Sequence, residues 1–141
     1  MGNKLLLVST FITAFSFSVL AQAEKTEEVI ELRSNGCEID ESNFNEVSQN
    51  ARKNMGEKDA LIVIARRGTR DKKRDLNRLR LATTRAWLVG KGAFPTNRLI
   101  LAEGERVDGE GRLEFYIGGK LTHIIFPKPN FGLCAECCSG R

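Results

Sequence analysis

The sequence has little of what enzymes use for catalysis. Its 141 residues include one histidine, His123, which stands in an apolar run with no serine or aspartate arranged around it. The chain also lacks the metalloprotease, phosphate-loop and dinucleotide-binding motifs that would hold a metal, a phosphate or a cofactor. We therefore expect a protein that is not an enzyme and that binds no cofactor.

Long apolar runs are absent as well, except at the N-terminus. Residues 1–23 combine a lysine near the start, an apolar run from Leu5 to Leu20, and an A-x-A sequence ending at Ala23. This is typical of a signal peptide, and the run is too short for a comfortable membrane span. We expect an exported, periplasmic chain with no transmembrane segment after cleavage. Aromatic residues make up only 7% of the chain, and exported proteins rarely meet nucleic acid, so no nucleic-acid partner is expected.

All four cysteines follow the signal peptide, as Cys37, Cys134, Cys137 and Cys138. An even number of cysteines in an exported chain indicates disulfides. Cys137 and Cys138 are poor partners for each other, because the Cα atoms of neighbouring residues lie closer than an unstrained bridge allows. We therefore expect Cys37 to pair with one C-terminal cysteine, and the other two to pair within or near the tail. A metal or redox site made from these thiols is the alternative.

Residues 60–92 read as a strand, a charged turn and a helix. The apolar run at residues 60–65 predicts a central strand that is covered on both faces. Residues 71–89 contain no proline or glycine and predict a helix that ends at the glycines following it. The side of this helix that faces the sheet is predicted to carry Leu76, Leu79, Ala82, Thr83, Ala86 and Val89. Leu81 and Leu88 fall on the other side and need another cover, in the same chain or on a partner.

Shorter patterns complete the order of elements. Further strands are predicted at residues 29–32, 98–102 and 112–117. Residues 121–126 are expected either to extend the last of these or to add an edge strand, before two prolines forbid further pairing. A first helix is predicted to begin after Asp40 or Ser42 and to end at Gly56. Its apolar series is Phe44, Val47, Ala51 and Met55.

This order, βαβαββ, determines the predicted fold class. Because strands and helices alternate, we expect an α+β fold, a two-layer sandwich in which both helices cover one face of a mixed sheet. Residues 24–127 form the predicted domain, and residues 128–141 form a cysteine-bearing tail.

Five short motifs follow one another between residues 29 and 117. They are the apolar strand before Gly68-Thr69-Arg70-Asp71, then Leu81-x-x-x-Arg85-Ala86, Gly92-x-x-Pro95-x-x-Arg98-Leu99, Gly104-Glu105, and Gly111-Arg112-Leu113-Glu114. Their order and spacing resemble the peptidoglycan-associating C-terminal domain of the OmpA-like family. The resemblance implies non-covalent binding to cell-wall peptidoglycan.

Members of that family hold the diaminopimelate group of the stem peptide between a loop aspartate and a helix arginine. The resemblance implies that Asp71 holds the ammonium group and Arg85 the carboxylate, through charge-assisted bonds. If the family motif is aligned on Gly92 instead, Arg80 falls at the position of the family's ligand-binding arginine. Arg67 and Arg70 in the basic turn would attract other wall carboxylates. The alternative is an adaptor of an envelope assembly that keeps the fold and has lost the wall site.

Overall fold

The computed structural model describes residues 28–134, which form five strands and two main helices. The elements are β1 (Ile30–Arg33), α1 (Cys37–Asn54), β2 (Leu61–Arg66), α2 (Leu76–Arg85), a π-helical turn (Ala86–Lys91), a 3-10 turn (Thr96–Arg98), β3 (Leu99–Glu103), β4 (Arg112–Ile117) and β5 (Lys120–Phe126). The predicted signal peptide and the end of the tail lie outside the described residues. No helix in the described part is long and apolar enough to cross a membrane.

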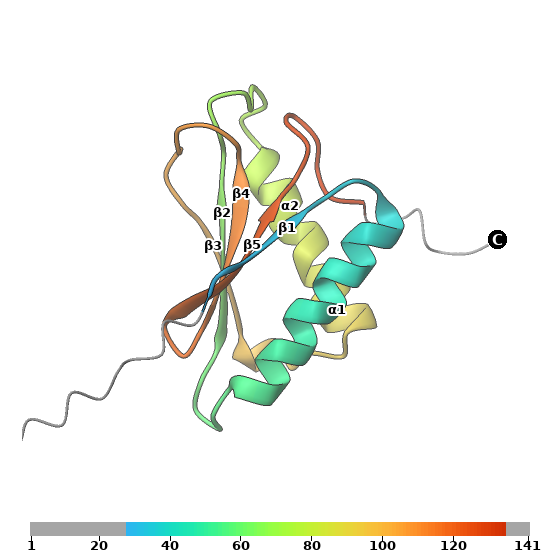
Figure 1. The fold of residues 1–141 in the computed structure, drawn as a ribbon, viewed down its shortest axis with the longest axis vertical. Coiled ribbons are helices and arrows are strands. Elements are labelled where there is room, and N and C mark those ends of the chain that lie inside the picture. The colour runs from blue at the N-terminus through green and yellow to red at the C-terminus, as the bar shows by residue number, and fades with distance from the viewer. Residues whose placement is uncertain (1–27, 135–141) are drawn as a thin grey trace, which may run out of the picture.

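The strands form one mixed sheet in the order β1-β5-β4-β2-β3. β1 runs parallel to β5 and β2 parallel to β3, while β4 is antiparallel to both of its neighbours. Both helices lie on the same side of the sheet (Figure 1), so the predicted α+β sandwich with a mixed sheet is confirmed. The predicted order βαβαββ holds as far as β4, and β5 adds a fifth strand to it. Residues 121–126 form a separate strand, β5, which was one of the two predicted alternatives. Its predicted position at the edge was wrong, because β1 pairs along the other side of β5 and places it inside the sheet.

β2 buries one of its faces completely. Leu61, Val63 and Ala65 are in the core, whereas Ile62 and Ile64 on the other face are half-buried. The prediction that both faces of this strand are covered was therefore wrong for the described residues. The crossovers through α1 and α2 place both helices on one face, so the other face is shielded only by side chains of neighbouring strands.

The helical stretch after β2 buries a different side from the one predicted. Leu81 and Leu88, expected to need another cover, are in the core, while Leu79 is 49% exposed and Ala82 and Ala86 are exposed. The buried residues are Leu76, Asn77, Arg80, Leu81, Thr83, Thr84, Trp87 and Leu88. Their spacing is helical, but half of them are polar. Apolar periodicity alone therefore pointed to the wrong side.

α1 begins at Cys37, before either predicted cap. Asp40 and Ser42 both lie inside the helix, and the buried Asp40 carboxylate accepts the backbone N–H of Cys134 at 3.2 Å. The carboxylate is thus engaged with the C-terminal segment and does not cap the helix. The predicted apolar series is confirmed, since Phe44, Val47 and Ala51 are buried and Met55 packs against the core.

Candidate functional site

Asp71 lies in the loop between β2 and α2. A helix was predicted from residue 71, but α2 begins at Leu76, because the loop first folds back around the Asp71 carboxylate. Asp71 is only 1% exposed, and its Oδ2 accepts the backbone N–H of Gly68 at 2.9 Å. Gly111 packs directly against the carboxylate, where any Cβ would overlap Oδ2. The surrounding backbone therefore encloses the acid.

Arg80 is the charge partner of Asp71. It lies in α2 with no exposed surface, and two of its N–H groups donate to the two carboxylate oxygens at 2.9 and 3.1 Å. Burial alone would raise the pKa of Asp71. Hydrogen bonds from Arg80 and from the backbone of Asn130 and Gly68 outweigh burial, so the pKa lies below its usual value. Asp71 is thus held ionised in the interior by a bidentate arginine.

Residues 128–134, here called the C-terminal strap, run from the end of β5 toward the start of α1. Cys134 forms a disulfide with Cys37, and its carbonyl accepts the indole N–H of Trp87 at 2.8 Å. The predicted pairing of Cys37 with a tail cysteine is confirmed, and the other two cysteines lie outside the described residues. The bond uses two thiols of the alternative metal site. Within residues 28–134 no group of three side chains that could hold a metal ion is found.

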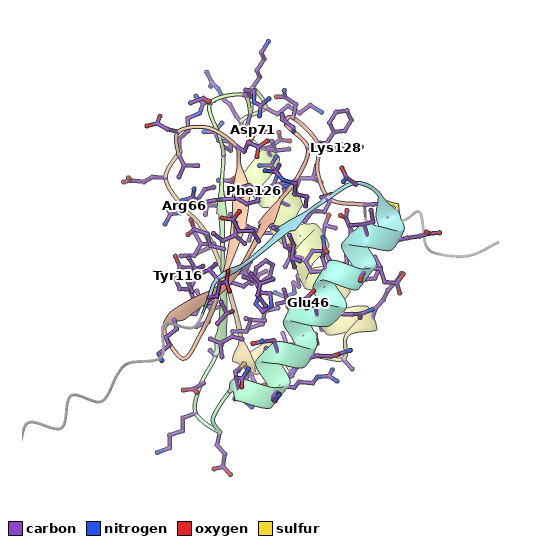
Figure 2. All side chains as sticks on the ribbon, viewed as in Figure 1. Glu46, Arg66, Asp71, Tyr116, Phe126 and Lys128 are labelled. Carbon is purple, nitrogen blue, oxygen red and sulfur yellow. A yellow bond between two sulfur atoms is a disulfide. The ribbon has the colours of Figure 1, made fainter. Side chains whose placement is uncertain are left out.

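The strap closes over the buried pair. The backbone N–H of Asn130 donates to Asp71 Oδ1 at 2.9 Å. The carbonyls of Phe131 and Lys128 accept N–H groups of Arg80 at 3.3 and 3.4 Å. Figure 2 shows Asp71 and Lys128 at the same end of the molecule. Backbone groups of the strap thus take up hydrogen-bonding positions on both charged side chains.

The side chain of Asn130 also ties the strap to the loop. Its amide oxygen accepts the backbone N–H of Lys72 at 2.6 Å, and its amide nitrogen donates to the carbonyl of Arg70 at 3.0 Å. One residue therefore contacts the loop on both sides of Asp71.

Of the four predicted ligand-binding residues, Asp71 alone joins the buried pair. Arg70 is exposed and forms an ion pair with Glu110 at 3.0 Å. Arg67 is half-buried and donates to a backbone carbonyl of its own loop at 3.4 Å. Arg85 is exposed, and its side chain has no hydrogen bond or ion pair with any described residue. The structure therefore does not bring these three arginines together around Asp71.

Two residues of the site were missed or underrated by the sequence reasoning. Arg80 is indicated only when the family motif is aligned on Gly92, and this alignment takes second place to the one on Arg85. The motif around Arg85 points instead to a residue on the exposed side of α2. Asn130 contributes its backbone N–H to the site, a group that almost every residue offers, so no sequence pattern could have indicated it.

A second polar cluster lies on the face of the sheet away from the helices. Glu114 is buried there and accepts hydrogen bonds from Arg66 at 2.9 Å, Arg112 at 2.7 Å and the hydroxyl of Tyr116 at 2.9 Å. Burial would raise the pKa of Glu114, but the bonds from Arg66, Arg112 and Tyr116 lower it overall. Burial, and then the bond to Glu114, raises the pKa of Tyr116. The cluster is internally satisfied and joins β2 to β4.

His123 is fully buried between the sheet and α1. Its Nδ1 lies 3.0 Å from Thr122 Oγ1, and its Nε2 has no partner among the described residues. Burial lowers the pKa of His123, against a smaller opposing effect of Glu46.

A surface hollow of about 480 Å3 lies near the β4–β5 turn, at the end of the sheet opposite Asp71 and Arg80.

No protein-family model, no curated protein and no solved structure matches this chain.

Proposed function

We propose that the protein is an exported, OmpA-like interaction module of an envelope assembly, whose wall site is closed by its own C-terminal strap. One observation carries the proposal: the Asp71 carboxylate has no accepting capacity left. Its oxygens receive two N–H groups from Arg80 and one each from Gly68 and Asn130. A carboxylate offers about four lone-pair sites in all. A stem-peptide ammonium would first have to displace the strap and then separate a buried ion pair.

The anchoring of the strap supports a permanently closed site. One end continues from β5, and the other is held by the Cys37–Cys134 disulfide. Disulfides of this kind persist in oxidising compartments such as the periplasm. The bond therefore supports both the proposed periplasmic location and a strap that stays in place while the protein works.

Non-covalent binding to peptidoglycan is the second candidate function. The observation that favours it is that an acid and an arginine do meet in the loop and helix where the family clamp is expected, with Arg80 in place of Arg85. In this function Asp71 holds the ammonium group of the stem peptide and Arg80 holds its carboxylate. Both contacts require the strap to move away first.

Sedimentation with purified sacculi separates the two candidates. The wild type, Asp71→Asn, and a variant with both Cys37→Ser and Cys134→Ser are compared at low and high salt, with Arg85→Ala as the control arginine. We expect no salt-resistant co-sedimentation of the wild type. Salt-resistant binding that Asp71→Asn abolishes would reject the closed site. Binding that appears only without the disulfide, and that needs Asp71, would establish peptidoglycan as a ligand beneath the strap.

The interaction role has its own test. After chemical cross-linking of intact envelopes, the protein is expected to migrate in a defined complex. A protein that remains monomeric in every envelope fraction would contradict the adaptor function, whatever the sacculus experiment shows.

A further inference from the structure

The strap presents an aromatic side chain to the surface. Phe131 is 65% exposed, the largest exposed fraction among the big apolar residues of the described chain. Leu79 of α2 is 49% exposed and lies beside the strap, because its side chain packs against Gly132. Leu79, from a distant part of the sequence, therefore lies against the strap residue that follows Phe131.

The backbone that carries Phe131 is fixed. Its carbonyl accepts from the buried Arg80, its N–H donates to the carbonyl of Lys128 at 3.1 Å, and the preceding Asn130 is bonded to Asp71. A single exposed apolar residue is ordinary. An aromatic side chain held out by an anchored backbone is instead preorganised for contact, because little conformational freedom is lost when a partner covers it.

Exposed basic residues lie in the strap and in the loop that contacts it. The loop next to the strap contributes Lys72, Lys73 and Arg74, and the strap contributes Lys128; all four are exposed. None of the four forms an ion pair with a described residue. Asp71 does not offset them, because Arg80 already neutralises it, which leaves Asp75 as the exposed acid in this loop. The two segments that meet here, residues 72–75 and the strap, therefore carry more positive than negative charge.

We propose that Leu79, Phe131 and these four basic side chains form a docking surface, the strap patch, for an acidic protein segment with an apolar anchor residue. The proposal rests on the proposed function as an interaction module and names the kind of partner. The charge selects an acidic segment and steers its approach. The apolar pair selects a segment that can bury a side chain against Phe131, since aromatic residues enclosed by a polar rim dominate binding at interfaces.

The test uses a fluorescein-labelled peptide of repeated Glu-Glu-Leu units, titrated with the mature protein and followed by fluorescence anisotropy. Phe131→Ser is expected to weaken binding by about tenfold or more, because the aromatic anchor is lost. The charge variant Lys72→Glu/Lys128→Glu is expected to weaken binding similarly and to reduce its salt dependence. Ile100→Ser is the control for Phe131→Ser, because Ile100 is another large exposed apolar residue, 49% exposed, but lies on β3. Lys58→Glu/Lys120→Glu is the control for the charge variant, because both lysines are exposed and lie outside the strap patch. The controls should stay within about twofold of the wild type.

Three results would overturn the strap patch: no binding of the peptide, equal weakening by Phe131→Ser and Ile100→Ser, or equal weakening by the two charge variants. Binding of polyglutamate or of phosphatidylglycerol vesicles as tight as that of the peptide would assign the patch to a polyanion or a lipid surface instead. Thermal melts check that the variants are folded. Salt-resistant sacculus binding that needs Asp71 but not Phe131 would reject the closed site alone, so the two failures are distinguishable.

Discussion

Breaking the Asp71–Arg80 pair tests the closed site directly. Asp71→Ala leaves the Arg80 guanidinium in the interior with only two carbonyl partners, at 3.3 and 3.4 Å. It also removes the acceptor of the backbone N–H groups of Gly68 and Asn130. We expect strong destabilisation, because a buried charge, one buried donor and one half-buried donor lose their partner at once.

The size of the effect follows from burial. Removing one member of a buried ion pair costs about 3–5 kcal/mol of unfolding free energy. Arg70→Ala is the matched control, because the side chains of Arg70 and its partner Glu110 are 63% and 31% exposed, and such surface pairs contribute about 0–1 kcal/mol. The double variant Asp71→Ala/Arg80→Ala should cost less than the sum of the single variants, by about 0.5–3 kcal/mol, since neither charge remains alone.

Urea unfolding at neutral pH measures these differences from midpoints at an unchanged slope. An Asp71→Ala variant that loses no more stability than Arg70→Ala would refute the reasoning. The carboxylate would then be solvated and the site open, and stem-peptide binding would become the better-supported function. A double variant whose cost equals the sum of its parts would show that the two side chains do not interact in solution.

Three further predictions concern other parts of the fold. Reducing the Cys37–Cys134 bond, which spans 97 positions, should lower the unfolding free energy by about 2–5 kcal/mol, because the bond closes a long loop in the unfolded chain; coinciding urea midpoints with and without reductant would contradict this. Burial lowers the pKa of His123 below its ordinary 6.5, so the folded state binds fewer protons than the unfolded state. Stability should therefore be full above that value and should decline as the pH falls, whereas His123→Leu should show a flatter profile in urea titrations across about pH 5 to 7. Glu114→Gln should lower the pKa of Tyr116, because it removes a hydrogen-bonded anion while burial remains. The chain has one tyrosine, so an absorbance titration of the tyrosine reports this residue alone. A Tyr116 titration that is unchanged in the variant would rule out the contact.

The order of elements could be predicted because it depends on signals that are local in the sequence. The apolar run that became β2 and the glycine pair that turns between β4 and β5, with φ of 57° and 80°, are such signals. The buried side of α2 could not be predicted in the same way. Arg80 and Thr84 are polar yet buried, the first paired with Asp71 and the second donating to the carbonyl of Arg80 at 2.8 Å. Hydropathy counts both residues as solvent-facing and shifts the apparent core side of the helix.

The cover over Asp71 follows from the connection of the strands more than from any motif. β5 runs parallel to β1 with Phe126 opposite Arg33, so the chain leaves the sheet at the end where β1 passes into α1. The disulfide then requires the strap to reach the first residue of α1 within a few positions. The β2–α2 loop emerges at this same end, because Arg66 lies opposite the first residue of β4, which is antiparallel to β5. A short strap held at both ends of this edge therefore passes over the loop and closes the site. The cover thus depends on the pairing of β1 with β5 and on the bond between Cys37 and Cys134, and the sequence left both of these open.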